Sequence, residues 1–363
     1  MRGAVSSRYV DARSGGAGFL LMPGRGSMMQ ITLERGELVE SRHRVHLAAV
    51  RVGEAPVAWS GNPRLVTFVR SAAKPFQALP LVEEGAVERW QIPSNELALC
   101  CASHSGEPVH IEGVRRLLDR IDVSEEELEC GPQLPTHQPS AHALLARGEA
   151  PMPIHNNCSG KHAGMLALAR HLGWARRGYR RSGHPVQERM VAEVARWTGL
   201  ESEEIVRGVD GCGVVCFGLP LEALALAFAR LGEAAKREEK GSVTVLEAMV
   251  AHPFHVAGSG RLCTRLMKVT EGRTVAKLGA EGVYAALDRR QGIGIALKVE
   301  DGARRACEVA LLESLHQLGS LEPGERESLS EWVSPPVLNT RGEAAAHLRS
   351  QGSLEGPGTE GAR

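Results

Sequence analysis

The sequence lacks an excess of charge of either sign. Lys and Arg together number 43, as do Asp and Glu, so the formal net charge is zero. Proteins that bind nucleic acid or a membrane surface ordinarily need a basic excess or patch. The sequence also lacks any apolar run long enough to span a bilayer. These two absences argue against a nucleic-acid partner and against a membrane role.

The eight cysteines do not show the spacing of a disulfide framework. No secretory signal precedes them, because the early apolar patch at residues 19–22 is too short for a signal-peptide core. We therefore expect reduced thiols and a cytoplasmic protein.

The two ends of the chain differ in composition from its centre. Residues 1–28 are rich in Arg, Gly and Ser, and we expect a disordered extension before a natural start at Met28 or Met29. Residues 341–363 are rich in Gly, Ser and Glu, and we expect a disordered tail. Residues 29–340 then form a single domain with a sheet part and a helical part.

Hydrophobic periodicity places strands at both ends of this domain and helices in its middle. Residues 44–52 and 55–60 have the pattern of paired strands, as do residues 283–287 and 293–299. Residues 131–153 are rich in Pro and His and predict a loop. The pattern predicts an α+β fold whose terminal strands build one antiparallel sheet. The predicted helices cover residues 76–82, 107–121, 160–172, 185–198, 219–231, 243–250 and 302–318.

Ser71 and Lys74 have the spacing of a nucleophile and its base. On a helix, residues i and i+3 share a face, so the hydroxyl and the amine can meet. A serine hydroxyl needs a base at neutral pH, and a lysine can serve only when burial or a second cation keeps it neutral. The same motif often marks a helix start with a solvated lysine, so its value depends on partners elsewhere in the chain.

Three further segments could supply those partners. Ser103 and Ser105 precede a predicted helix, and helix capping is the simpler interpretation of Ser105. Asp210 and Cys212 lie among glycines, where the backbone can approach a ligand, although a plain turn has the same composition. The Lys277-x-Gly motif comes third, in the order found in penicillin-binding proteins and serine β-lactamases. A second lysine would help to keep the first one neutral.

The densest polar cluster is residues 155–162, which read His-Asn-Asn-Cys-Ser-Gly-Lys-His. It lacks the upstream glycine of a phosphate-binding loop. Cys158, His162 and a distant cysteine could hold a metal ion, although Cys-x-x-Lys is not an ordinary zinc pattern. The residues alone leave both a metal site and a plain polar cluster open.

Together these segments resemble the Rhizobium-etli-type, or class 3, L-asparaginases. The resemblance covers residues 31–318, and the Asn-Asn-Cys-Ser-Gly-Lys-His string is its most specific element. It implies a fold similar to serine β-lactamases and glutaminases, a homodimer, and hydrolysis of L-asparagine to L-aspartate and ammonia. The matching segments are residues 43–46, 70–75, 102–106, 129–131, 155–162, 210–212 and 277–282.

The resemblance also implies the residues of the site. It implies one zinc ion per subunit, which supports the site rather than performing the chemistry. The implied residues are the pairs Ser71 with Lys74 and Ser103 with Lys277, and the zinc ligands Cys158, Lys161 and Cys212.

For the mechanism we expect acyl transfer. Ser71 attacks the side-chain carboxamide carbon, Ser103 and Lys277 relay protons, and water hydrolyses the acyl-enzyme. A small zwitterionic substrate also needs a cation for its α-carboxylate and an anion for its α-ammonium group. The candidates are Arg44 or Arg70 for the carboxylate and Asp210 for the ammonium group.

Two other functions stay open. Another serine amidohydrolase, of the glutaminase or β-lactamase type, would share the serine and lysine motifs but gives no reason for Cys158, Lys161 and Cys212. A non-catalytic zinc or amino-acid binding protein could retain the scaffold. Zinc content and ammonia release from asparagine and glutamine distinguish these functions.

Overall fold

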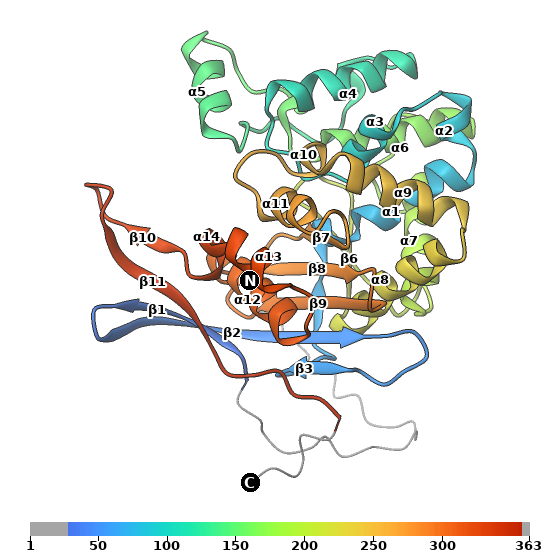
Figure 1. Ribbon diagram of the computed structural model, residues 1–363. Helices are drawn as coiled ribbons and strands as arrows, with labels where there is room; N and C mark the ends of the chain where they lie inside the picture. The colour runs from blue at the N-terminus through green and yellow to red at the C-terminus, as the bar shows by residue number, and fades with distance from the viewer. Residues whose placement is uncertain (1–27, 358–363) are drawn as a thin grey trace, which may run out of the picture.

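The computed structural model of the chain describes residues 28–357. Those residues have an α+β fold, as the hydrophobic pattern predicts, with helices gathered beside one curved sheet (Figure 1). The predicted N-terminal extension lies outside the described residues, apart from Met28. The strands are β1 (Gln30–Arg35), β2 (Leu38–Val50), β3 (Ala58–Ser60), β4 (Val66–Phe68), β5 (Val206–Val209), β6 (Val215–Pro220), β7 (Thr274–Leu278), β8 (Val283–Asp288), β9 (Ile293–Val299), β10 (Pro336–Leu338) and β11 (Ala344–Gln351).

The large sheet joins strands from the two ends of the chain, as predicted. Its order is β10-β11-β1-β2-β9-β8-β7, with β3 paired to β2, and every pairing is antiparallel. The long strand β2 pairs with β1 through its first half and with β9 through its second half. The predicted disordered tail is wrong for β11, because this strand pairs with β1 and buries Ala346 and Leu348.

Helices fill the middle of the chain. The loop predicted for residues 131–153 contains α5, whose proline lies in the first turn, where a missing backbone N–H is tolerated. The helices are η1 (Arg70–Ala73), α1 (Lys74–Glu83), α2 (Ala86–Arg89), α3 (Ser94–Cys100), α4 (Pro108–Arg120), η2 (Glu125–Glu127), α5 (Gln138–Ala146), η3 (Pro153–His155), α6 (Ser159–His171), α7 (Pro185–Thr198), α8 (Leu221–Lys236), α9 (Lys240–Ala251), α10 (Pro253–Val256), α11 (Leu262–Val269), α12 (Arg304–Gln317), α13 (Pro323–Ser328) and α14 (Ser330–Val333).

The core lies between the central strands and the helices that cover them. Helices α8 and α12 both pack against β9, and β9 is buried at nearly every position, so both faces of the sheet are covered there. Gly294 in β9 allows the close approach of α8, because a Cβ at this position would lie 1.9 Å from the Ala225 carbonyl oxygen.

A second, three-stranded sheet positions part of the site, and the sequence did not indicate it. Strand β6 pairs with both β4 and β5 in the order β4-β6-β5. Arg70 follows the end of β4 and Asp210 follows the end of β5. The shared pairing therefore brings together two segments that are 140 residues apart in the chain.

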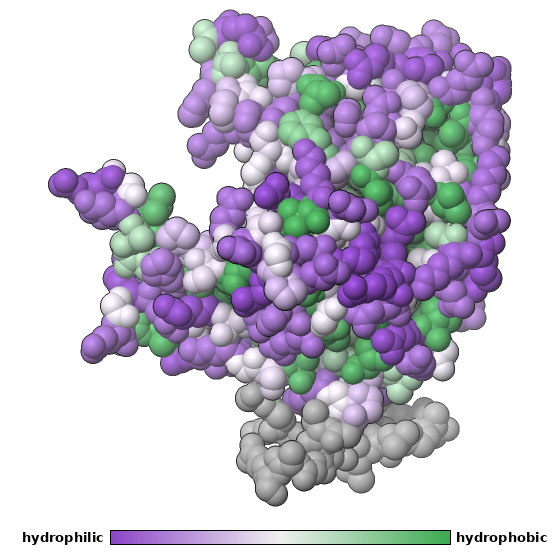
Figure 2. All heavy atoms as spheres, in the orientation of Figure 1, coloured by the Kyte–Doolittle hydropathy of each residue, from purple (hydrophilic) through white to green (hydrophobic). Residues whose placement is uncertain are grey.

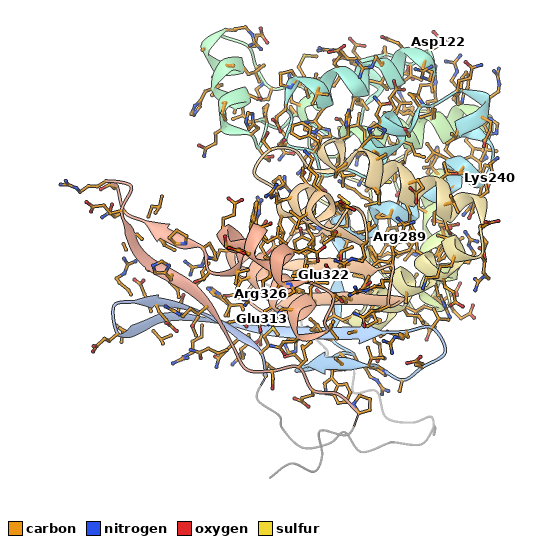
Figure 3. The ribbon with its side chains drawn as sticks, viewed as in Figure 1. Asp122, Lys240, Arg289, Glu313, Glu322 and Arg326 are labelled. Atoms are coloured by element: carbon orange, nitrogen blue, oxygen red, sulfur yellow. The ribbon has the colours of Figure 1, made fainter. Side chains whose placement is uncertain are left out.

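Hydrophilic residues dominate the visible face of the molecule (Figure 2). Charged side chains such as Asp122, Lys240 and Arg289 lie at its exterior (Figure 3). Among residues 28–357, none of the helices combines the length and the apolar character needed to cross a bilayer.

Candidate active site

Two lysine amines converge on the hydroxyl of Ser103. Lys74 Nζ lies 3.0 Å from Ser103 Oγ, and Lys277 Nζ lies 2.9 Å from the same oxygen. Lys74 begins α1, Lys277 lies on β7, and Ser103 lies in the loop between α3 and α4. All three side chains are buried. The predicted pair of Ser103 with Lys277 is therefore in hydrogen-bond contact, and Lys74 joins it.

The loop that carries Ser103 is fixed through its backbone. Ser103 N–H donates to the Val256 carbonyl at 3.0 Å, and the next N–H, of His104, donates to the Asn157 carbonyl at 3.2 Å. These bonds come from two other segments, one beside α10 and one before α6. Because the loop is held on both sides, the Ser103 hydroxyl has a defined place between the two amines.

The contact of Ser71 with Lys74, which the spacing predicts, is not formed. The three hydrogen bonds of Lys74 Nζ go to the Ala102 carbonyl, the Ser103 hydroxyl and the Cys158 thiol, at 2.5, 3.0 and 3.1 Å. An ammonium group has three donors, so these acceptors occupy all of them. Ser71 is half-buried, and its hydroxyl makes no hydrogen bond within residues 28–357.

The electrostatics of this cluster act mainly on Lys277. Burial and the neighbouring Lys74 cation lower the pKa of Lys277 to about 7. A large fraction of Lys277 is therefore neutral near pH 7 and able to accept a proton. Burial and the Lys74 charge therefore give Lys277 the role of the neutral amine, which the sequence analysis assigned to Lys74.

The predicted zinc ligands lie next to this cluster. Lys161 Nζ donates to Cys212 Sγ at 3.1 Å, and the thiols of Cys158 and Cys212 share a hydrogen bond. That bond is the largest cause of a lowered pKa of Cys212, about 5, and the Lys161 cation adds to it, whereas the pKa of Cys158 is raised to about 12 by the same bond and by burial. All three side chains are buried.

This donor set suits a soft divalent ion. A thiolate, a second thiol and an amine meet within contact distance, and zinc prefers sulfur and nitrogen ligands. Lys161 would have to release its proton on binding, because metal ligands are deprotonated. His162 Nδ1 contacts the Tyr179 hydroxyl at 2.6 Å, and its Nε2 is buried without a hydrogen-bond partner among the described residues. Among the described residues, no group of three or more His, Cys, Asp or Glu side chains is arranged to hold a metal.

Arg70 and Asp210 form an ion pair with each other. Arg70 Nε lies 2.7 Å from Asp210 Oδ1, and this ion pair is partly buried. Asp210 also lies beside the predicted zinc ligands, because its carboxylate is 3.9 Å from Cys212 Sγ. Arg70 has a φ of 50°, which is unusual for a residue other than glycine, so the ion pair helps to hold a strained backbone directly before Ser71.

Arg44, the other predicted carboxylate ligand, does not reach this site. Its exposed guanidinium forms an ion pair with Glu300, and its backbone pairs with Gln30 of β1. The cavity that it lines is bounded by Arg42, Glu300 and Asp301 and contains none of the other predicted site residues. Arg44 therefore belongs to a surface cluster on the sheet.

The sequence did not indicate two charged residues beside Ser103. Glu107, not Ser105, caps α4, and it accepts hydrogen bonds from Ser105 Oγ at 2.6 Å and from Ser259 N–H at 2.8 Å. Arg261 donates to the Ser103 carbonyl at 3.5 Å. The glycines at 258 and 260, which flank Ser259, were the feature of the sequence that could have indicated a loop able to approach a ligand closely.

The comparisons with known proteins identify the family of the chain. No curated protein matches the chain at a significant level. The L-asparaginase II family, however, matches residues 31–350, which include every predicted site residue. Membership of this family makes the chain an amidohydrolase of the asparaginase type with a small-molecule amide substrate. The chain belongs to the L-asparaginase II family.

Proposed function

We propose that this protein hydrolyses L-asparagine to L-aspartate and ammonia through an acyl-enzyme on Ser103. The observation that carries the proposal is the hydroxyl of Ser103 held between Lys74 and Lys277. The motif position favours Ser71 as the nucleophile, whereas the hydrogen bonds favour Ser103, because only its hydroxyl contacts an amine able to accept a proton.

In the acylation step, Ser103 donates its proton to the neutral amine of Lys277 while its oxygen attacks the carboxamide carbon. The C–O bond forms, the C–N bond breaks, and the Lys277 ammonium returns the proton to the leaving ammonia. The Lys74 ammonium stands beside the attacking oxygen, where it stabilises negative charge as it develops. Water then attacks the ester and gives its proton to Lys277, which passes the proton to the Ser103 oxygen as the C–O bond breaks and aspartate leaves.

We give Ser71 a supporting role rather than that of the nucleophile. It lies one residue after Arg70, whose partner Asp210 is the candidate for the substrate α-ammonium group. A substrate ammonium would share the Asp210 carboxylate with Arg70, and the half-buried Ser71 hydroxyl has no competing bond among the described residues. In this proposal Ser71 orients the substrate through a hydrogen bond.

We further propose a zinc ion held by Cys158, Lys161 and Cys212. Such an ion supplies Lewis-acid polarisation and a fixed positive charge when bound. Cys158 also accepts a hydrogen bond from Lys74, so the proposed zinc ligands are connected to the lysines that contact Ser103. The homodimer and the cytoplasmic location stay predictions from the family resemblance and from the composition.

Ammonia release tests the proposed function. Purified protein is assayed with L-asparagine, L-glutamine and a chromogenic β-lactam, and bound metal is measured on the same sample. We expect the highest kcat/KM on asparagine. Preferential turnover of glutamine or the β-lactam would favour the other serine amidohydrolases, and zinc without any amide hydrolysis would favour a binding protein.

A further inference from the structure

Arg261 is a cation without a carboxylate partner at the edge of the serine cluster. It is half-buried, and its guanidinium forms no ion pair within residues 28–357. Its single hydrogen bond there, from Nη1 to the Ser103 carbonyl, is long at 3.5 Å. A guanidinium carries five N–H donors, so most of them are left for another acceptor.

The other cations near the site are already engaged. Arg70 is paired with Asp210, and the three donors of Lys74 have acceptors within the protein. The charge of Arg261 acts on its surroundings: after burial and the effect of Lys74, it contributes to the lowered pKa of Lys277. The Arg261 charge also acts to lower the pKa of the Glu308 carboxyl, but Glu308 forms its ion pair with Arg304, at 3.6 Å.

The position of Arg261 fits the length of the substrate. In asparagine, three covalent bonds separate the carboxamide carbon from the α-carboxylate carbon. Within Ser103, three covalent bonds also separate the hydroxyl oxygen from the carbonyl carbon whose oxygen Arg261 contacts. On this basis we place the α-carboxylate of a substrate near the guanidinium when its carboxamide lies at the hydroxyl.

The loop that carries Arg261 is held in place before any ligand binds. Glu107 accepts bonds from the N–H and the hydroxyl of Ser259, both at 2.8 Å, and from the hydroxyl of Ser105. One carboxylate thus ties the Arg261 loop to the Ser103 loop. Gly258 has a φ of 111°, and a Cβ there would lie 2.0 Å from Ser105 Oγ. The Arg261 loop and the Ser103 loop are therefore packed so closely that no side chain fits between them at Gly258.

We infer that Arg261 binds the α-carboxylate of the substrate and so determines the preference for amino-acid amides over simple amides. The inference rests on the proposed asparaginase function. It assigns the carboxylate to Arg261 instead of to Arg44 or Arg70, because those two guanidiniums are paired with Glu300 and Asp210. A planar guanidinium can bind a carboxylate through two parallel hydrogen bonds.

Two amides that differ in the carboxylate alone test this inference. L-asparagine is compared with 3-aminopropanamide, which is asparagine without its α-carboxylate, in the wild type and in Arg261→Met. We expect Arg261→Met to lower kcat/KM for asparagine about 100-fold relative to kcat/KM for 3-aminopropanamide, mainly through KM. If turnover of the second amide is slow, its inhibition constant against asparagine serves instead.

Two variants complete the test. Arg265→Met removes another arginine near the start of the same helix, whose guanidinium contacts the Ser328 carbonyl, and should leave both amides unchanged. Arg261→Lys keeps the positive charge but cannot form two parallel hydrogen bonds to a carboxylate, so it should recover part of the loss. It replaces the Met variant if that variant does not fold.

The possible outcomes separate the two proposals. Equal losses on both amides in Arg261→Met would overturn the inference, because Arg261 would then only position the Ser103 loop. A wild type that releases no ammonia from asparagine would overturn the proposed function, and the inference with it. Selective loss on asparagine supports both.

Discussion

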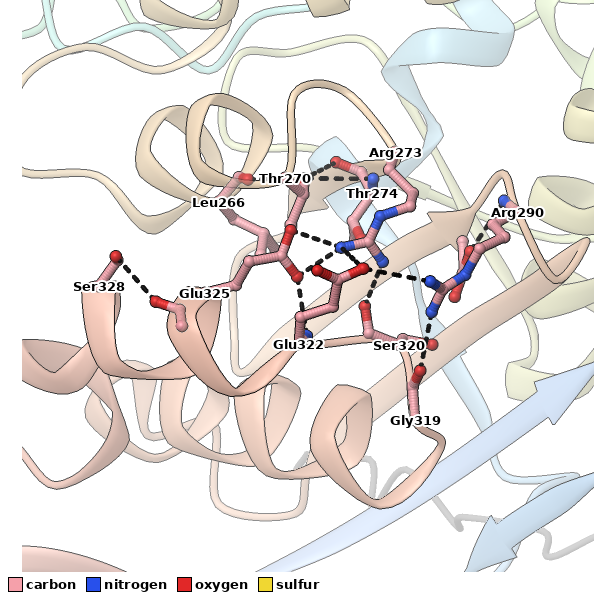
Figure 4. A network of polar contacts seen from close by, with 12 residues as sticks. Leu266, Thr270, Arg273, Thr274, Arg290, Gly319, Ser320, Glu322, Glu325 and Ser328 are labelled. Atoms are coloured by element: carbon pink, nitrogen blue, oxygen red, sulfur yellow. Dashed lines mark hydrogen bonds and ion pairs between the residues drawn. The ribbon is translucent and has the colours of Figure 1, made fainter.

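Two polar networks of this protein differ in how their charges are matched. In the network of Figure 4, Arg273 forms an ion pair with Glu325 and donates to the Ser320 carbonyl at 2.8 Å, while Arg290 contacts Glu322 at 3.3 Å. Opposite charges alternate here. In the serine cluster, two buried lysines share one hydroxyl, and no carboxylate among the described residues contacts either of them.

The difference supports a structural role for the first network and the proposed catalytic role for the second. In the first network, Glu325 raises the pKa of Arg273, so each charge stabilises its partner. In the second, burial and a like charge lower the pKa of Lys277 to about 7, which disfavours its charged form. Groups held against their ordinary protonation state cluster at functional sites. Substitutions in the two networks should therefore affect different properties.

The largest effect should follow removal of the Ser103 hydroxyl. We expect Ser103→Ala to lower kcat on asparagine by about 10⁴-fold or more, because the acyl-enzyme cannot form. Ser71→Ala should lower it by about 10- to 100-fold, through lost orientation. Initial rates of ammonia release measure both. A Ser103→Ala enzyme with near-normal kcat, beside an inactive Ser71→Ala enzyme, would reverse the assignment.

Loss of the neutral amine should have the next largest effect. We expect Lys277→Met to lower kcat/KM by about 10²- to 10⁴-fold. A matched control is Lys298→Met, which removes a partly buried lysine on β9 whose Nζ contacts the Val299 carbonyl.

The pH profile of the wild type tests the same residue. A base acts in its deprotonated form, which becomes populated as the pH rises through the pKa. With the pKa of Lys277 at about 7, kcat/KM should fall as the pH decreases below about 7 and level off above it. A flat profile between pH 5.5 and 8.5 would contradict the role of Lys277 as the base.

A smaller effect, on metal content, should follow changes at Cys212. We expect purified wild type to carry zinc and Cys212→Ser to carry much less, because the thiolate is the strongest ligand of the set. Cys307→Ser is the control, since this buried thiol donates to the Arg304 carbonyl away from the cluster. Elemental analysis of folded protein measures the content. Equal zinc in wild type and Cys212→Ser would refute the ligand set.

The smallest effect on catalysis should come from substitutions in the network of Arg273 and Glu325. We expect Glu325→Gln to lower the free energy of unfolding by about 1–3 kcal/mol, because Arg273 is mostly buried and loses its charged partner. The kcat on asparagine should stay the same. Denaturant unfolding and ammonia release measure the two properties. A large loss of kcat would show that the two networks are coupled.

Much of the fold could be predicted from periodicity. The two apolar segments at residues 283–287 and 293–299 and the helical spacing of residues 107–121 correspond to elements of the structure, because local patterns of burial decide them. The strand β11 was missed, because its alanines and polar residues resemble a tail until β1 pairs with them. The strands β4 to β6 were missed because they are short, and because β4 pairs with β6 across a long stretch of chain, from Phe68 to Gly218.

The candidate site was predicted unevenly. The motifs named Ser103 and Lys277, since residue type and order are visible in the sequence, and the family resemblance named Cys158, Lys161 and Cys212. Arg261 and Glu107 were not named, because each acts through a loop that only the tertiary structure brings beside Ser103.

The sequence by itself determined which chemical groups are present and which family they belong to. It placed Ser71 three residues from Lys74, and local spacing favoured that pair. Only the tertiary structure decided that Lys74 turns inward to Ser103 and Cys158. The physical reason is that a buried ammonium group needs three acceptors, and these come from segments up to 84 residues away rather than from its own helix.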